Sequence, residues 1–368
     1  MNGRERLLRV LDGKPTDRVP WTTIADDGSR HHMPDGYRNV NILDFYRKIG
    51  CDILQFGTHG MPSGTEPDYP FEFKTDVIEQ IESLPNETLS ITRKLNGRTL
   101  QVISQKGHPI KYPVESPEEL RIYLEMVEAS QVSEKDIIND DSFSRCSETI
   151  GDSGIFAPTM LPSPVQQLIE YECGIEAFYY LLADHTELME RVIATMFKRK
   201  YTECKLLAEK TPFPMIIPVE NTSSAMISPS LYRKYSLPHM QAYADVIHRN
   251  DKKFIIHMCG HLKDLLPEFK KIGLDGIHAL TPPHTGDCSF ESALDVLGED
   301  LIIIGILPPE LLHHPLATAD DIREGVKSVL TARIKESNFI LWPGIDGIST
   351  DIWRLEAVRD GVEKYGAR

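Results

Sequence analysis

Hydrophobic positions in the second half of the chain fall into short continuous runs, each followed by a polar loop and a longer amphipathic stretch. Continuous apolar runs of this length are typical of parallel strands that are buried on both faces. Two further runs precede them in the first half. The eight runs lie at residues 19–24, 53–56, 154–157, 215–219, 253–256, 276–280, 301–305 and 338–342. Eight strand–loop–helix units predict an α/β fold of the (β/α)8 TIM-barrel type.

The stretches between the apolar runs have helical periodicity, and some have recognisable ends. Ser228 followed by Pro229 predicts an N-cap and a first helical residue. Gly273 predicts the end of a helix. The predicted helices span about residues 187–209, 261–272, 290–297, 319–335 and 350–364, and another begins at Pro229.

The segment from about residue 70 to 115 follows a different pattern. Residues 91–103 predict a β-hairpin that turns at Asn96-Gly97, because this dipeptide favours the tight turns of antiparallel hairpins. We interpret the segment as an antiparallel flap inserted into the barrel, so that residues 1–368 form one domain. A doubly wound open sheet is the structural alternative. It is disfavoured because no G-x-G-x-x-G sequence follows an early strand.

Composition and charge restrict the class of protein. The chain has 368 residues, 41% of them hydrophobic, and a formal net charge of −15. An acidic protein is a poor partner for nucleic acid or for an anionic membrane surface. No uncharged apolar run approaches the ~20 residues that span a bilayer, the six cysteines are scattered, and the first residues lack the apolar core of a signal peptide. We therefore expect a cytoplasmic protein that binds neither nucleic acid nor membranes.

His257 and Cys259 form the most informative pair in the chain. They follow the apolar run at 253–256, and residues two apart on a strand project to the same face. An imidazole beside a thiolate is a metal-binding pair, and Zn2+ is the ion it most often binds. The alternative is a strand that ends in one hydrogen-bonded histidine and one buried cysteine. The spacing alone does not decide between the two.

Barrel enzymes build their active sites from the loops at the carboxyl ends of the strands. Carboxylates, imidazoles and thiols collect at these positions, and a metal needs three or four such ligands. Glu220 follows the neighbouring strand and strengthens the case for a metal at His257 and Cys259. We predict substrate contacts from a second set: Asn221, His59, His278 and Asp27. The remaining polar residues at the strand ends are Asp26, Thr58, His284, Asp287, Cys288 and Asp346.

Several motifs, taken in their order along the chain, resemble those of the uroporphyrinogen decarboxylase superfamily. They are Arg4–Leu8, Leu11–Pro20, Tyr112–Leu120, Ile227–Tyr232, His257–Gly260 and Pro343-Gly344. The resemblance covers essentially the whole chain. It implies a (β/α)8 barrel, in agreement with the count of apolar runs.

The resemblance also distinguishes two branches of the superfamily. The true decarboxylases grip substrate propionates with an arginine-rich segment, whereas the matching segment here, Ala25–Arg30, contains Asp26 and Asp27. A tetra-anionic porphyrinogen would be repelled there. The other branch resembles zinc methyltransferases that work with corrinoid proteins, whose coenzyme M members hold the metal by H-x-C and a distant cysteine. His257 and Cys259 match the first part, but Ile345 occupies the position of the distant cysteine.

This departure suggests how the metal site would differ. The resemblance implies zinc ligands His257 and Cys259, and we predict a carboxylate, Glu220 or Asp346, as the third. One thiolate and one carboxylate leave zinc a stronger Lewis acid than two thiolates do. Such a site suits the activation of an oxygen leaving group.

We therefore hypothesise a methyltransferase that moves a methyl group from a methoxylated, for example aromatic, small molecule or a similar donor to cob(I)alamin. The chain lacks the D-x-H-x-x-G signature of cobalamin-binding modules, so a separate corrinoid protein would carry the cobalamin. One alternative is methyl transfer from a methylated corrinoid to a thiol or pterin. Others are a metal-independent decarboxylase and a non-catalytic barrel that binds a ligand. Members of the family often form homodimers, so a homodimer is also an expectation.

Overall fold

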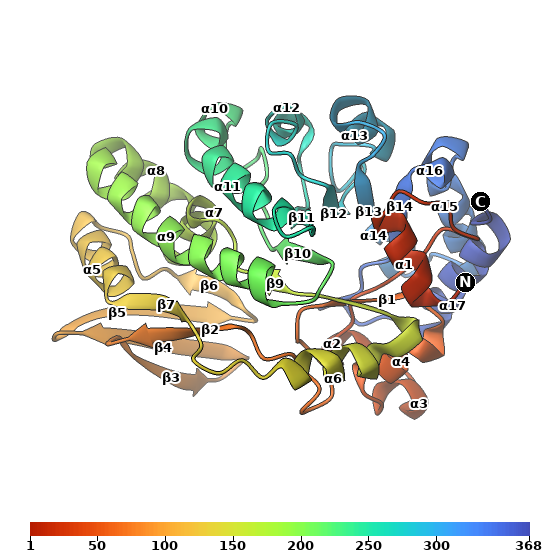
Figure 1. Cartoon of the computed structure of the whole chain (residues 1–368), viewed down its shortest axis with the longest axis horizontal. Coiled ribbons are helices and arrows are strands. Elements are labelled where there is room, and N and C mark those ends of the chain that lie inside the picture. The colour runs from red at the N-terminus through yellow and green to blue at the C-terminus, as the bar shows by residue number, and fades with distance from the viewer.

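Parallel strands occupy the centre of the molecule (Figure 1). The computed structural model describes residues Met1–Arg368. A six-stranded parallel sheet contains β9 (Thr159–Met160), β10 (Met215–Pro218), β11 (Lys253–His257), β12 (Gly276–Leu280), β13 (Ile302–Ile306) and β14 (Asn338–Trp342) in chain order. A two-stranded parallel sheet contains β1 (Ile53–Phe56) and β8 (Gly154–Ala157). Every residue of β8, β10 and β12 is buried. The predicted parallel α/β arrangement is therefore confirmed.

The two parallel sheets are not joined into one closed sheet. Only Pro158 separates β8 from β9, and its carbonyl accepts a hydrogen bond from Ile217 N at 2.9 Å. The segment predicted as the first strand forms a single bridge, from Trp21 to Leu341 of β14. On its other side, the Trp21 carbonyl accepts a hydrogen bond from Asp52 N at 2.8 Å. The prediction of a strand at 19–24 was wrong. Pro20 has no backbone N–H to donate. The Thr22 hydroxyl, rather than a backbone group of the segment, accepts a hydrogen bond from Leu54 N.

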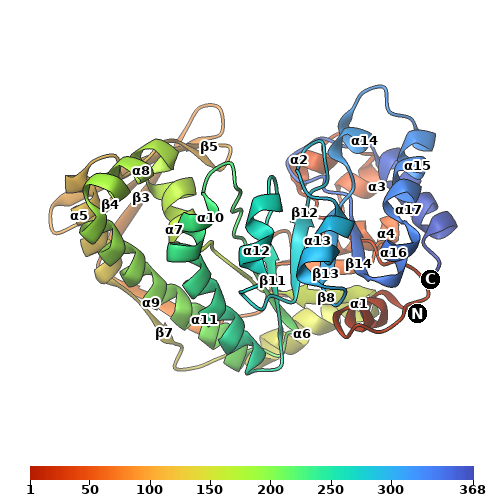
Figure 2. The ribbon, with the colours of Figure 1, turned by 90° about the horizontal axis from the view of Figure 1, so that it is seen from above.

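Helices surround the parallel strands (Figure 2). The predicted helix at 290–297 is α13 (Phe290–Leu297), and the one at 187–209 is α9 (Thr186–Lys210). The Ser228 hydroxyl accepts a hydrogen bond from Leu231 N, as predicted for an N-cap. No helix is both long and apolar enough to cross a bilayer. The other helices are α1 (Gly3–Leu11), α2 (Asp27–Arg30), α3 (Asp35–Arg38), α4 (Ile42–Ile49), α5 (Pro117–Glu128), α6 (Asp140–Ile150), α7 (Pro164–Gln167), α8 (Gly174–Asp184), α9 (Thr186–Lys210), α10 (Pro229–Leu231), α11 (Leu237–His248), α12 (Leu266–Phe269), α14 (Pro309–His313), α15 (Ala319–Val329), α16 (Ala332–Glu336) and α17 (Ile352–Tyr365).

Two predicted helices differ from the observed ones. The helix expected at 319–335 is divided into α15 and α16, because Leu330 leaves the helical conformation and Thr331 caps a new helix. The helix expected at 261–272 contains only a short 3-10 turn and α12. Its start is held as a loop, since the Asp287 carboxylate accepts hydrogen bonds from Leu262 N and Lys263 N at 2.7 and 3.1 Å.

The flap is a four-stranded antiparallel sheet of β3 (Ile78–Leu84), β4 (Thr88–Leu95), β5 (Arg98–Gln105) and β6 (His108–Lys111). Its predicted turn at Asn96-Gly97 is confirmed, and both turn residues have positive φ, at 49° and 79°. The sheet packs against α5 on one side of the molecule, opposite the two termini (Figure 2). A second antiparallel pair, β2 (Phe71–Thr75) with β7 (Ser130–Glu134), is formed by the segments that precede the flap sheet and follow α5 in the chain.

A small apolar cluster fills the space between the parallel strands. It contains alternate residues of the strands, such as Ile255 and Ile304, together with Leu7 and Val10 of α1. A larger apolar cluster lies between the strands and the surrounding helices. The small cluster, not the larger one, includes Trp342 at the end of β14. The polar side chains of the candidate site lie at and beyond the carboxyl ends of the strands, as His257 at the end of β11 and His278 in β12 show.

Candidate functional site at the carboxyl ends of the strands

Strand β11 carries His257 to the carboxyl end of the sheet, and Cys259 follows two residues later. The His257 carbonyl accepts hydrogen bonds from Glu220 N and Asn221 N, both at 3.0 Å, and Met258 N donates to the His278 carbonyl at 2.9 Å. These bonds hold the strand end between its two neighbours. His257 is partly exposed, and Cys259 is exposed. Both predicted zinc ligands therefore face the loops rather than the core.

His257 and His278 lie opposite each other on paired strands, with their Nδ1 atoms 2.6 Å apart. One imidazole must donate and the other accept at this distance. Burial lowers the pKa of His257 to about 4. Burial, followed by the charge of His257, lowers the pKa of His278 well below its usual range. The Nε2 atom of His257 has no hydrogen-bond partner in the protein and remains free to bind a ligand.

Aromatic rings pack around the two imidazoles. The Phe56 ring stacks on His278 with centroids 5.0 Å apart and an interplanar angle of 18°. The centroid of the Trp342 ring lies 4.5 Å from the centroid of the His278 ring. The Trp342 Nε1 atom is buried and has no hydrogen-bond partner. Since these rings come from β1 and β14, they form an apolar floor under the strand ends and fix the orientation of the histidines.

Negative charge gathers around Cys259. Partial desolvation by the surrounding protein, followed by the carboxylates of Glu170 and Asp346, raises the pKa of the Cys259 thiol. Burial and the neighbouring Asp26 raise the pKa of Asp346, and only His313 opposes this effect with positive charge. Asp26 also joins two loops, because its carboxylate accepts a hydrogen bond from Gly347 N at 2.8 Å. No lysine or arginine contributes to the pKa of Cys259 or Asp346.

Glu220 is fully buried and has hydrogen-bond partners of its own. Its carboxylate accepts bonds from Ser163 N at 2.6 Å, Ser163 Oγ at 2.7 Å and Thr222 Oγ1 at 3.0 Å. Burial raises the pKa of Glu220 to about 7. The carboxylate thus ties the loop before α7 to the end of β10. No three His, Cys, Asp or Glu side chains lie close enough together to hold a metal ion, so the structure does not group Glu220 or Asp346 with the His257–Cys259 pair.

Asn221 and Glu170 form the polar wall of the site. Asn221 has a left-handed backbone, with φ 49°, and its Nδ2 donates to Glu170 Oε1 at 3.1 Å. The Asn221 Oδ1 atom is buried without a partner. Sequence reasoning missed Glu170, which lies in the π-helical segment Leu168–Glu172. No local pattern marks such a segment, so only the fold brings Glu170 to the strand ends.

The other predicted substrate residues are spread more widely. His278 is almost fully buried beneath the aromatic rings. His59 is exposed, and its carbonyl accepts a hydrogen bond from Gln55 Nε2 at 3.1 Å. The Asp27 carboxylate is fully exposed and pairs with Arg30 at 2.9 Å. Asn221 is thus the predicted contact with a buried polar atom still available to a ligand.

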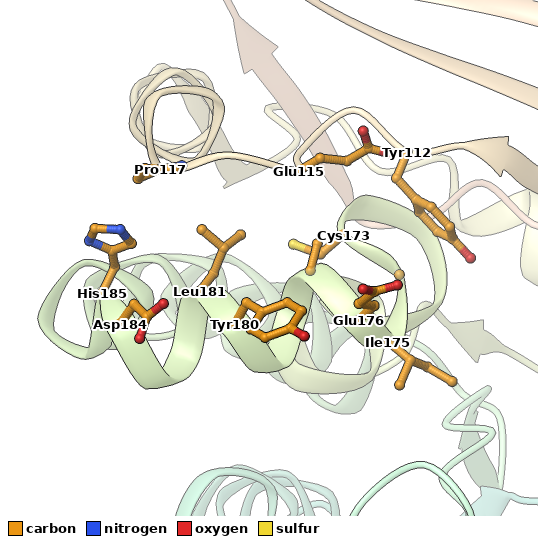
Figure 3. A pocket seen from close by; sticks show the side chains of 12 residues that line it. Tyr112, Glu115, Pro117, Cys173, Ile175, Glu176, Tyr180, Leu181, Asp184 and His185 are labelled. Carbon is orange, nitrogen blue, oxygen red and sulfur yellow. The ribbon is translucent and has the colours of Figure 1, made fainter.

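A separate cavity of about 560 Å³ lies on the outside of α8 (Figure 3). Figure 3 shows Tyr180 and Asp184 along α8 and Tyr112 on the facing segment that leads to α5. None of the predicted metal or substrate residues lines this cavity. The candidate site therefore remains at the strand ends.

Comparisons with known proteins agree with the family resemblance. The model of the family described as uroporphyrinogen decarboxylase (URO-D) matches residues 174–365, just over half of the chain. No curated protein sequence matches the chain significantly.

Among solved structures, D-psicose 3-epimerase, crystallised in the presence of D-fructose, has 11% identity and a TM-score of 0.37, and the match covers 61% of this chain and 81% of that one. Dispersin B has 7% identity and a TM-score of 0.37, with 95% and 99% covered. The pneumococcal protein StrH has 8% identity and a TM-score of 0.41, with 98% and 85% covered.

Proposed function

The chain belongs to the uroporphyrinogen decarboxylase family, and from this premise we propose that it is a zinc-dependent methyltransferase. It would move a methyl group from a methoxylated aromatic or similar donor to the cob(I)alamin of a separate corrinoid protein. The observation that carries this proposal is the placement of His257, whose Nε2 atom is free, two residues from the exposed Cys259, with the carboxylates of Glu170 and Asp346 nearby. Such a site favours a cation and disfavours a polyanionic porphyrinogen.

The donor atoms fit a zinc ion in their chemistry. His257 is neutral, which is the protonation state that binds metal, and its Nε2 atom is free. A cation would also stabilise the Cys259 thiolate against the nearby carboxylates. We propose His257 and Cys259 as ligands and Asp346 as the third, which requires the loop after β14 to bring Asp346 to the pair, since no three such side chains lie close enough together in the structure. Glu220 is not assigned, because its carboxylate already accepts three hydrogen bonds.

His278 acts on the metal ligand rather than on the substrate in this proposal. Ligand histidines usually form a hydrogen bond through their second ring nitrogen, which selects the tautomer and the ring orientation. The Nδ1 contact between His257 and His278 has this arrangement. It leaves Nε2 of His257 as the metal-binding atom.

The remaining residues would bind and orient the donor. Zinc bound here would act as a Lewis acid toward the leaving oxygen. Phe56, which is partly exposed, offers an apolar face to an aryl group. The unpartnered Oδ1 atom of Asn221 would accept a hydrogen bond from a hydroxyl group of the methylated substrate. Contacts from His59 and Asp27 stay predictions.

We also propose that the two parallel sheets belong to one (β/α)8 barrel in a single domain, with the flap as an insertion. The Trp21 segment supports this proposal, since it bonds both β14 and the residue before β1. The same proposal explains why side chains from β1, β11, β12 and β14 meet at one end of the molecule.

Metal content and methyl transfer test the proposed function. We expect about one equivalent of zinc in gently purified protein and demethylation of at least one compound in a panel of methoxylated aromatics, followed by the absorbance of the corrinoid protein. Cys259→Ser should lose zinc and methyl transfer but remain folded, because Cys259 is exposed. Cys288→Ser, in the loop after β12, is the control and should keep both.

Two results would contradict the proposal. One is zinc below about half an equivalent, and the other is full methyl transfer by Cys259→Ser. Methyl transfer only from methylated corrinoid to a thiol or pterin would reverse the assigned direction. Release of CO2 from a carboxylated substrate by zinc-free protein would favour the decarboxylase alternative.

A further inference from the structure

A cavity of about 610 Å³ lies between the flap and the parallel region. Its walls come from β2, β4, α5, the segment Leu168–Glu172 and α9. Figure 2 shows α5, β4 and α9 gathered on the side of the molecule away from the two termini. A cavity of this size accommodates a small organic molecule. None of the predicted metal or substrate residues lines it.

The helical segment from α7 to Glu172 separates this cavity from the candidate site. Gln166 Nε2 donates a hydrogen bond to the Asn221 carbonyl at 3.3 Å, and Asn221 Nδ2 donates to Glu170 at 3.1 Å. Gln167 and Glu172 line the cavity instead, and Gln167 Nε2 donates to Glu172 Oε1 at 3.1 Å. Different side chains of one segment therefore face two different sites.

The two arginines of the cavity differ in their partners. Arg93 pairs with both carboxylates of the lining, with Glu172 at 2.8 Å and with Glu79 at 3.5 Å. The Arg199 side chain is 20% exposed, and its ion-pair partner Glu203 lies outside the lining, 3.7 Å from Nε. This separation is too long for a hydrogen bond. The Nε atom is buried without a partner, so the Arg199 guanidinium is the cation of the cavity that lacks a hydrogen-bond acceptor.

We propose that this cavity binds a small aromatic monocarboxylate, with its carboxylate on the Arg199 guanidinium. The N–H groups of a guanidinium form a fork that matches the two oxygens of a carboxylate. The ring would lie among the six apolar side chains of the lining, Phe73, Val77, Tyr123, Met126, Val127 and Leu161. This proposal is independent of the methyltransferase assignment.

The lining distinguishes this ligand from other small molecules. Glu79 and Glu172 would repel a phosphate dianion more strongly than a monoanion. A neutral molecule without an acceptor would leave the Arg199 donors unpaired, which weakens binding. The half-exposed Phe73 ring lies 6.0 Å from Arg199 Cζ and offers a packing surface to an aromatic ring held there. Gln167, which is 8% exposed, has a buried Oε1 atom without a partner, and a hydroxyl group on the ring would supply the missing donor.

Fluorine NMR of the full chain with 4-fluorobenzoate and with 4-fluorobenzamide tests the proposal. The two probes are similar in shape, and only the benzoate is charged. The benzoate should bind with a dissociation constant below about 1 mM, and the amide should bind at least roughly tenfold more weakly. Arg199→Gln should weaken benzoate binding at least roughly tenfold and thereby remove the preference.

Arg191→Gln is the matched control for the Arg199 variant. Arg191 lies on the same helix, pairs with Glu128 at 3.2 Å in an exposed contact, and does not line the cavity. This substitution should leave the dissociation constant of the benzoate within about twofold of the wild-type value. A loss equal to that of Arg199→Gln would contradict a specific role for the Arg199 guanidinium.

Two substitutions of Leu161 test the location by their sign. Leu161 lines the cavity and is 60% exposed, so neither change threatens the fold. Leu161→Lys should tighten benzoate binding roughly threefold, and Leu161→Glu should weaken it roughly threefold, whereas the amide should respond to neither. Equal affinity for the two probes would overturn the proposal, as would a benzoate affinity that Arg199→Gln leaves unchanged. Equal effects of the two Leu161 variants would exclude this cavity as the binding site.

Discussion

The parallel strands and the flap differ in what they leave exposed. Every residue of β10 and β12 is buried, whereas every residue of β3 is exposed. In the parallel region, backbone hydrogen bonds and apolar packing occupy each strand along its length, so chemistry is possible only at the strand ends. In the flap, one face packs on α5 and an entire edge stays open. The candidate site therefore lies at the strand ends of the first region, whereas an exposed edge strand distinguishes the second.

The largest effect should come from an ion cluster that holds the parallel region together. Asp52 is buried, pairs with Arg6 and with Arg18, the latter at 2.8 Å, and accepts a hydrogen bond from Trp21 N at 3.2 Å. Asp52→Ala leaves the buried Arg6 without this partner and should cost about 3–5 kcal/mol of unfolding free energy. Urea unfolding of the full chain measures the change.

An ion pair of the flap provides the control for this experiment. Arg98 and Glu125 join β5 to α5 at 2.6 Å, and both side chains are nearly half exposed. Glu125→Ala should cost less than about 1 kcal/mol, because exposed pairs contribute little. Equal losses of unfolding free energy for the Asp52 and Glu125 variants would contradict the expectation that the buried ion cluster stabilises the protein more than the exposed flap pair.

An intermediate effect is expected from the pH dependence of Glu220. Its pKa is about 7 in the folded protein, above its ordinary value of 4.5. Between these values the folded protein holds a proton that the unfolded chain has released, so stability falls as pH rises through this window. Between about pH 5 and pH 8 the wild type should lose about 2 kcal/mol more than Glu220→Gln. Parallel unfolding curves at the two pH values measure this, and identical pH dependences would contradict the buried environment of Glu220.

The smallest effect should come from the turn of the flap. Gly97 has φ 79°, and alanine there would cost about 1 kcal/mol because its Cβ disfavours this conformation. The loss should be confined to the flap, as local hydrogen exchange of β4 and β5 would show. Lys94→Ala, at an exposed position on the same strand pair but outside the turn, is the control. Faster exchange in β10 or β12 would indicate that the two regions do not respond separately.

Local patterns predicted the elements that depend on neighbouring residues. Continuous apolar runs identified β8, β10, β12 and β14, and the Asn96-Gly97 dipeptide identified the turn between β4 and β5. The period of two along a strand predicted that His257 and Cys259 form a pair, and Cys259 lies two residues beyond the end of β11, so that pairing stays a prediction. The strand expected at 19–24 failed because Pro20 has no N–H to donate, and the segment forms only a single bridge, from Trp21 to Leu341.

The sequence by itself determined the alternation of strands and helices, the flap hairpin, the family, and the residue types at the strand ends. Only the tertiary structure decided which of those residues meet. It turned Glu220 toward Ser163, set His278 against His257, and brought Glu170 to Cys259 from a π-helical segment. Strand register and helix packing control these contacts across more than 20 residues of chain in each case, so no local pattern of hydrophobic and polar positions records them.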